Sequence, residues 1–131
     1  MEAEISRYMT DQPHSIRPGE SLEHAKQIMD KHKIRHLPVV DNKKIVGLIT
    51  ERDFSLINLY PELDLKKSAV EDLMLQSVYE VLPDTPLNTV VQNMAENKYG
   101  CAVVMNDKSE LVGIFTSIDA LKLIHKLYDR P

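Results

Sequence analysis

The sequence predicts a mixed α/β (α+β) fold in which two β-α-β-β-α repeats pack on each other as a pseudo-twofold pair. Two observations carry this prediction. One is a heptad written twice, GLITERD at residues 47–53 and GIFTSID at 113–119. The other is a series of apolar and turn residues that recurs at an offset of 65, as when Ile5 meets Val70. Because two copies are too few for a solenoid, we expect them to pack on each other.

Each repeat begins with a leader, at residues 3–9 or 68–74, and continues with a short extended piece at 14–16 or 79–81. Turn residues then introduce a helix. Ser21 is the expected cap of the first helix, and Thr85 followed by Pro86 is expected to start the second. Apolar residues at helical spacing follow. They are Leu22, Ala25, Ile28 and Met29 in the first repeat and Leu87, Val90, Val91, Met94 and Ala95 in the second.

Two short apolar runs joined by turn residues come next in each repeat, which predicts a hairpin. The runs are 37–40 and 45–49 in the first repeat and 101–104 and 111–115 in the second. A second helix is expected from Asp53 and from Asp119. The predicted domains are a first repeat at 1–59, a connector at 60–67 and a second repeat at 68–131.

The last helix of each repeat carries more apolar residues than one buried face requires. They are Phe54, Leu56, Ile57 and Leu59 in the first repeat and Leu121, Leu123, Ile124, Leu127 and Tyr128 in the second. A helix that is apolar on several sides is usually covered on several sides. We therefore expect a homodimer.

The composition of the chain argues against several classes of function. The chain has 131 residues, of which 43% are hydrophobic and 27% charged, as in soluble globular proteins. A net charge of −4 without a block of Lys or Arg argues against a nucleic-acid surface. The start, MEAEISRYMT, lacks the apolar core of a secretory signal, and no apolar run is long enough for a bilayer. With one cysteine, these features predict a cytoplasmic protein without membrane insertion.

The heptad places a threonine three residues before an aspartate, as in Thr50 with Asp53. One interpretation is structural: the threonine caps a helix, the aspartate completes a capping box, and Gly47 allows close packing or a bulge. The other is functional. A helix start with a hydroxyl donor suits a phosphate, and a carboxylate there can accept two hydrogen bonds from a ribose diol. The two interpretations are compatible, and both stay open.

The repeated heptads, the MTDQPHSIRPGESL opening and the IRHLPVVD segment resemble a tandem pair of cystathionine-β-synthase (CBS) domains, also called a Bateman module. The resemblance covers nearly the whole chain. It implies two clefts that bind an adenosine-containing ligand such as AMP, ADP, ATP or S-adenosylmethionine. The implied binding residues are Thr50 and Thr116 for phosphate or ribose, Asp53 and Asp119 for the ribose hydroxyls, Ile16 and Val81 for the adenine, and Pro38 and Val39 for the wall of the first pocket.

The two implied sites are not expected to be equal. The first repeat carries Arg35 and His36 before its strand and Arg52 in its heptad, and the family often uses basic residues at the first two positions for phosphates. The second repeat has Gly100 and Cys101 there, which suits a less charged ligand or none. Alternatively, Arg35 and His36 belong to a solvated edge strand, and Arg52 is a surface residue.

Other features predict no chemistry. His24 and His32 are too far apart along one helix to share a metal, so we expect no metal site. Cys101 is expected to be a buried, inert thiol, and no nucleophile lies in a pattern with a base. The sequence thus predicts a stand-alone regulatory module, not an enzyme. It would sense an adenosine ligand (AMP, ADP or ATP favoured, with or without Mg²⁺) and signal to an unidentified effector protein. The alternative is a structural, dimerisation or partner-docking module with empty clefts.

Overall fold

The computed structural model describes residues 3–129, so the outer ends of the two predicted repeats, residues 1 and 131, lie outside the described part. The chain divides into two compact units. The first unit comprises residues 14–78, and the second comprises residues 79–131 together with 1–13. Within residues 3–129, every helix is too short or too polar to span a bilayer.

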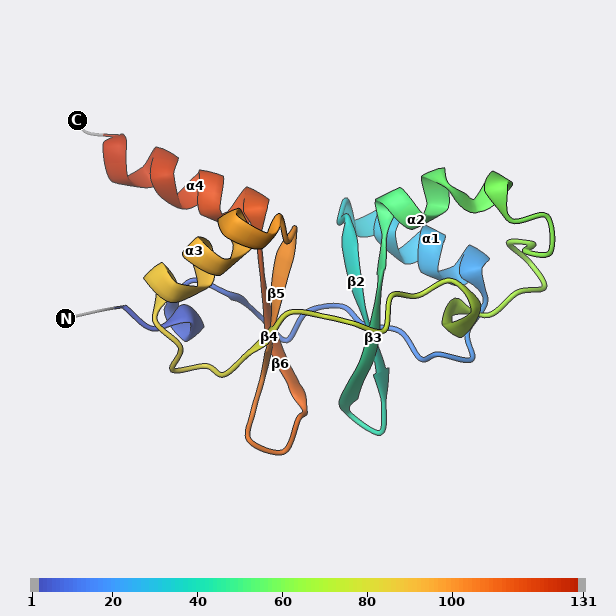
Figure 1. Cartoon of the computed structure of the whole chain (residues 1–131), viewed down its shortest axis with the longest axis horizontal. Helices are drawn as coiled ribbons and strands as arrows, with labels where there is room; N and C mark the ends of the chain where they lie inside the picture. The colour runs from blue at the N-terminus through green and yellow to red at the C-terminus, as the bar shows by residue number, and fades with distance from the viewer. Residues whose placement is uncertain (1–2, 130–131) are drawn as a thin grey trace. The chain divides into compact units, whose positions relative to one another are not determined.

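The first unit is built on one hairpin. Its elements are α1 (Leu22–His32), β2 (His36–Asp41), β3 (Lys44–Thr50) and α2 (Glu51–Ser55), followed by 3₁₀ turns at Ile57–Leu59 and Val70–Asp72. The second unit contains β1 (Thr10–Asp11), β4 (Glu80–Val81), α3 (Leu87–Asn97), β5 (Cys101–Met105), β6 (Leu111–Thr116) and α4 (Ser117–Tyr128), with a 3₁₀ turn at Ile5–Arg7. In each unit both helices lie on the same side of the sheet (Figure 1). The mixed α+β class is confirmed.

The second unit has a four-stranded sheet in the order β1-β6-β5-β4, with β4 parallel to β5 and the other pairs antiparallel. In the first unit only β2 and β3 form regular strands, and single bridges replace the two edge strands. Ile16 bridges Val39 in parallel, and Leu75 bridges Leu48 in antiparallel fashion. The edge pairing of the residues that directly follow each leader, Thr10–Asp11 in β1 and Leu75, was not predicted.

The leaders pack into the unit that carries the other repeat. Val70 is fully buried in the core of the first unit, where its amide donates to the Glu20 carbonyl at 2.8 Å. Ile5 is fully buried in the core of the second unit, where its amide donates to the Thr85 carbonyl at 2.8 Å. Each compact unit therefore contains the leader of the other repeat.

The helix starts are partly as predicted. Ser21 caps α1, and its hydroxyl accepts the His24 amide at 3.0 Å. Thr85 does not cap α3: its hydroxyl accepts the Leu82 amide at 3.2 Å, and Pro86 is the N-cap. The leader satisfies one of the free amides at this helix start, because the Ala3 carbonyl accepts the Leu87 amide at 2.7 Å.

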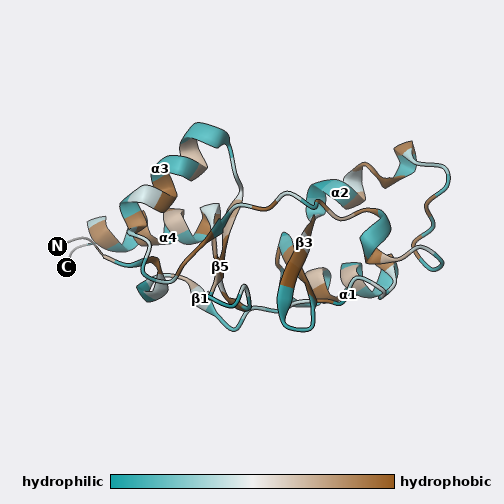
Figure 2. Ribbon diagram, turned by 60° about the horizontal axis from the view of Figure 1, so that its bottom comes forward, coloured by the Kyte–Doolittle hydropathy of each residue, from teal (hydrophilic) through white to brown (hydrophobic). Residues whose placement is uncertain are grey.

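The last helices begin two residues earlier than expected, at Glu51 and Ser117. They also differ in length. α4 runs for 12 residues, whereas α2 has five and passes into a 3₁₀ turn. Figure 2 shows strong hydrophobic colour along β3 and β5, the strands that contribute Ile49 and Val104 to the two cores.

Candidate functional site

A capping box stands at the end of the hairpin in each unit. The amide and the hydroxyl of Thr50 both donate to Asp53 Oδ2, at 2.8 and 2.9 Å, and the Asp53 amide donates to the Thr50 hydroxyl at 3.3 Å. The same three contacts join Thr116 and Asp119, at 2.9, 3.1 and 3.2 Å. The structural interpretation of the heptad is thereby confirmed.

The capping box leaves part of each aspartate available. Oδ2 accepts two hydrogen bonds from its threonine, whereas Oδ1 of Asp53 and of Asp119 has no hydrogen-bond partner among residues 3–129. Both side chains are half-buried. The box therefore fixes the orientation of a carboxylate whose second oxygen can accept from a ligand hydroxyl.

Strand pairing brings basic residues of the first unit to this box. His36 is the direct partner of Thr50 across β2 and β3, and the Arg35 carbonyl accepts the Glu51 amide at 2.9 Å. The Arg35 Nε lies 3.4 Å from Glu51 Oε2, and both side chains are largely exposed. Arg35, His36, Thr50 and Asp53 are thus brought together at one end of the hairpin.

His36 is half-buried between charges of both signs. Burial and then the Arg35 guanidinium lower its pKa below the ordinary value for histidine, while Asp53 and Glu51 act in the opposite direction. The neutral imidazole is therefore favoured in the protein as it stands. An added anion would favour the protonated ring, because an opposite charge nearby stabilises the charged form.

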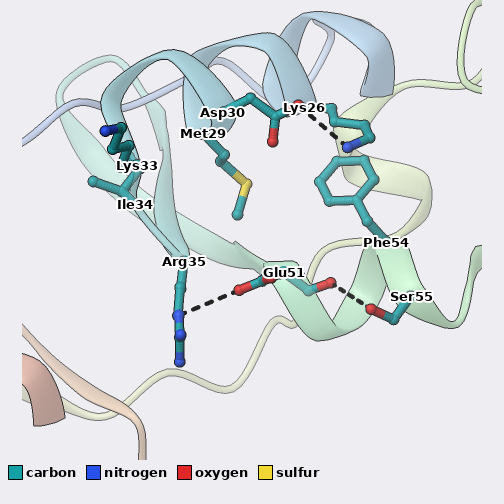
Figure 3. A pocket seen from close by; sticks show the side chains of 9 residues that line it. All are labelled: Lys26, Met29, Asp30, Lys33, Ile34, Arg35, Glu51, Phe54 and Ser55. Carbon is teal, nitrogen blue, oxygen red and sulfur yellow. Dashed lines mark hydrogen bonds and ion pairs between the residues drawn. The ribbon is translucent and has the colours of Figure 1, made fainter.

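A hollow of about 550 Å³ adjoins Arg35 between α1 and α2. Figure 3 shows Met29 and Phe54 directed into this space, with Arg35 paired to Glu51 at its rim. Lys26 and Asp30 pair across one turn of α1 at 3.2 Å. The hollow is also lined by Lys33, Ile34 and Ser55. Among the predicted residues, Arg35 belongs to this hollow.

A second hollow, of about 690 Å³, lies at the other end of the same unit. It is lined by residues 15–17 and Glu20, by His24 and Ile28 of α1, and by residues 40–43. Ile16 is therefore near a hollow, but its side chain is in the core, 5% exposed.

The residues predicted to wall the first pocket are core residues too. Val39 is fully buried in the first core, and Pro38 is among the fully buried side chains of this unit. The Ile16 amide donates to the Pro38 carbonyl at 3.0 Å, and the Val40 amide donates to the Ile16 carbonyl at 2.8 Å. Ile16, Pro38 and Val39 are thus brought together. Arg52 is exposed on the first turn of α2.

The second unit repeats the box without its basic neighbours. Cys101 is the strand partner of Thr116, and the Gly100 carbonyl accepts the Ser117 amide at 3.0 Å. Val81, predicted to line adenine there, is 7% exposed in the second core. Thr116 and Asp119 are brought together, and Val81 lies two strands from them in the order β6-β5-β4.

Cys101 is 4% exposed, and burial raises the pKa of its thiol to about 12. The predicted buried thiol is confirmed. Within residues 3–129, no cluster of three or more His, Cys, Asp or Glu side chains is arranged to hold a metal ion.

Sequence reasoning missed two groups of residues near the boxes. The first is Glu51, which pairs with Arg35. The position of Glu51 inside the heptad, next to Thr50, could have suggested its role. Tyr79 and Tyr99 form a stacked pair in the second unit. No local pattern joins two tyrosines that far apart in the chain, so only the fold brings this pair into view.

Comparison with known proteins identifies the family and the fold. The CBS domain model matches the chain twice, over residues 4–57 and 70–126. A Vibrio cholerae protein described as an acetoin utilization protein (AcuB) is 28% identical, with a TM-score of 0.87 and complete coverage of both chains. The CBS domain pair of protein MJ0100, solved with 5′-methylthioadenosine and S-adenosyl-L-methionine, is 28% identical, with a TM-score of 0.82, 93% coverage of this chain and 99% of the other.

Curated relatives include much longer enzymes. A homoserine O-acetyltransferase of Methanococcoides burtonii is 31% identical over 92% of this chain, but the match spans only 24% of the enzyme. An inosine-5′-monophosphate dehydrogenase of Methanocaldococcus jannaschii is 31% identical over 82% of this chain and 21% of its own length. The chain therefore spans about a quarter or less of these two relatives.

Proposed function

We propose that this chain, which belongs to the CBS domain family, is a regulatory module that binds an adenosine-containing ligand and carries no catalytic activity of its own. The ligand would be an adenine nucleotide (AMP, ADP or ATP, with or without Mg²⁺) or a relative of S-adenosylmethionine. Binding would shift the population of two arrangements of the protein, and an effector protein, still to be identified, would respond to that shift.

One observation carries the proposal: each unit holds a fixed aspartate, one oxygen of which has no hydrogen-bond partner in the described part of the chain. A ribose offers two neighbouring hydroxyl donors, which such an oxygen can accept. The capping box holds Asp53 and Asp119 in this orientation before a ligand arrives, so binding would cost little reorganisation. The pair of CBS domains in MJ0100, solved with two adenosine compounds, supports the choice of ligand class.

The box of the first unit favours a ligand with phosphate. Arg35 and His36 lie beside Thr50, and a phosphate could replace Glu51 as the partner of Arg35. Charge-assisted hydrogen bonds from arginine suit phosphate oxygens. We assign AMP, ADP or ATP to this box, with Arg52 as an additional cation at the surface and the backbone of Ile16, Pro38 and Val39 toward the base.

The test is calorimetry with AMP on the wild type and on three variants. Asp53→Asn should weaken binding at the first box at least tenfold, because an amide nitrogen replaces one acceptor oxygen. Asp119→Asn should leave that binding unchanged. The matched control is Asp72→Asn, because Asp72 accepts the Ala69 amide at 2.9 Å in a 3₁₀ turn of the same unit. It removes a similar local contact far from the box in sequence.

Thermal unfolding gives an independent measure. A ligand at a hundred times its Kd stabilises the folded protein by about 2.7 kcal/mol. AMP should therefore raise the unfolding temperature of the wild type and of Asp72→Asn but not that of Asp53→Asn. If AMP, ADP, ATP and S-adenosylmethionine all leave the wild type unchanged at millimolar concentration, the chain is not an adenosine sensor, and the docking-module alternative takes its place.

We further propose that the module is a cytoplasmic homodimer joined through apolar helix surface. Four side chains on one side of α4 are exposed: Ile118, Leu121, Ile124 and Tyr128. The first unit has a comparable exposed segment after α2, with Leu56, Leu59 and Tyr60. A second copy offers the same apolar surface, which is what a twofold interface requires.

A further inference from the structure

Two tyrosines of the second unit form an aromatic stack at the end of its sheet. The ring centroids of Tyr79 and Tyr99 lie 5.0 Å apart, with 25° between the planes. Tyr79 is fixed from three sides. It packs against the second core, its hydroxyl accepts from Asn93 Nδ2 at 3.0 Å, and its carbonyl accepts the Val103 amide at 2.9 Å. Tyr99 lies on this fixed ring and is 43% exposed.

The stack lies at the same end of the sheet as the second capping box. Tyr99 directly precedes Gly100, whose carbonyl accepts the Ser117 amide at 3.0 Å. The next residue, Cys101, is the strand partner of Thr116. Tyr99 therefore stands at the end of β5 that adjoins the box with Asp119, and the residue between it and Cys101 is a glycine, which has no side chain.

Charge distinguishes this box from the first. The first unit carries four basic residues around its box: Lys33, Arg35, His36 and Arg52. At the corresponding positions the second unit has Lys98, Gly100, Cys101 and Ile118, so only the lysine recurs. The second box therefore lacks three of the four basic side chains that could bind a phosphate, and it has the exposed ring of Tyr99 nearby.

We infer that the second box binds an adenine nucleoside without a phosphate group, with its ribose held by Asp119 and its base stacked on the exposed ring of Tyr99. This inference rests on the proposed function. Stacking on an aromatic side chain is a strong and sequence-tolerant way to hold a base. The fixed position of Tyr79 prepares Tyr99 for this role, because a supported ring loses little freedom when a base covers it.

The test compares adenosine and AMP by calorimetry on the wild type and on two variants of the exposed tyrosine. Tyr99→Leu removes the aromatic plane and keeps an apolar side chain, whereas Tyr99→Phe keeps the plane and removes the hydroxyl. Adenosine should bind the wild type and Tyr99→Phe with similar affinity and bind Tyr99→Leu about tenfold more weakly, within the range for base stacking. Asp119→Asn should abolish the same binding event, and Asp53→Asn should leave it intact.

The outcomes separate this inference from the proposed function. If adenosine binding depends on Asp119 but is equal in Tyr99→Leu and the wild type, the stack has no role, and the sensor function stands. If Tyr99→Leu instead weakens AMP at the site that depends on Asp53, the stack serves the other box, and the inference is wrong. If neither compound binds the wild type, both proposals fail. Circular dichroism and the unfolding temperature of each variant report whether it is folded, and Tyr99→Phe provides a folded reference if Tyr99→Leu is unstable.

Discussion

The sulfur of Met74 lies over Gly47 so closely that a Cβ on the glycine would come within 2.6 Å of it. Met9 covers Gly113 in the same way in the second unit. Both glycines stand at a β-bulge, since the register shifts between Val39 and Val40 and again between Val104 and Met105. The first residue of each heptad thus serves leader packing, and the close packing and the bulge expected from the sequence both occur.

This packing predicts unequal effects of two equivalent substitutions. A Cβ at Gly47 would also meet the backbone oxygen of Leu75, at 2.8 Å, which cannot move without shifting the leader. The three heavy atoms nearest to a Cβ at Gly113 all belong to the flexible side chain of Met9. Gly47→Ala should therefore cost about 1–3 kcal/mol of unfolding free energy, the usual range for overpacking, and Gly113→Ala should cost less.

Urea unfolding of the two variants measures this difference. Gly19→Ala is the matched control, because a Cβ there would meet no heavy atom within 4 Å. It should be neutral or slightly stabilising, since alanine restricts the unfolded chain. Equal losses for Gly47→Ala and Gly113→Ala would contradict the role assigned to the Leu75 carbonyl.

The repeated sequence predicted the helices and hairpins better than it predicted which leader packs into which unit. Hairpins, the Ser21 cap and the two capping boxes depend on residues close in sequence, and all were predicted. The exchange of leaders was not, because Ile5 and Val70 occupy equivalent positions and face two cores with similar apolar patterns. Sequence similarity between the copies therefore removes the information that would tell which core each leader joins.

Burial of Cys101 predicts a thiol that is inert in the folded protein. Its pKa is raised to about 12, so almost no thiolate, the reactive form, is present at pH 8. A chromogenic disulfide reagent should react with no thiol in buffer and with one thiol per chain in concentrated urea. Rapid reaction in buffer would show that β5 opens readily. The single cysteine of the chain makes the signal unambiguous.

His36 predicts a loss of stability on mild acidification. Because its pKa is lowered in the folded protein, first by burial and then by Arg35, the unfolded chain binds a proton more readily below the ordinary histidine pKa of about 6.5. Its contribution to stability is therefore complete above that pH and declines as the pH falls below it. The unfolding free energy of His36→Gln should fall less between pH 7.5 and 5.5 than that of the wild type.

The control for this measurement is Gln27→Ala, which removes an exposed, non-titrating side chain of α1. It should retain the wild-type pH dependence, because it removes no titratable group. If His36→Gln and the wild type lose equal free energy over this range, then His36 is not the group responsible. AMP offers a second check, because a phosphate beside His36 should favour its protonated form and reduce the acid loss.

The candidate site could be predicted only where its residues lie close together in the sequence. Thr50 with Asp53, and Thr116 with Asp119, lie three residues apart at a helix start, and this spacing determines their geometry. The stack of Tyr79 on Tyr99 depends on how α3, β4 and β5 come together. Ile16, Pro38 and Val39 were chosen as lining residues for their apolar character, which is equally a property of the core, and their side chains lie there.

The apolar side of α4 predicts that oligomeric state depends on this helix. Ile124 is 53% exposed and stands in a row with Leu121, 60% exposed, and Tyr128, 80% exposed. A charge placed in the middle of this row would be desolvated in a dimer without a partner, which is costly. Ile124→Lys should therefore convert a dimer of twice 15.0 kDa into a monomer, as measured by light scattering after gel filtration. Lys126→Ala, on the polar side of the helix, should remain dimeric. A wild type that is monomeric at tens of micromolar, or an Ile124→Lys variant that stays dimeric, would exclude α4 as the dimer surface.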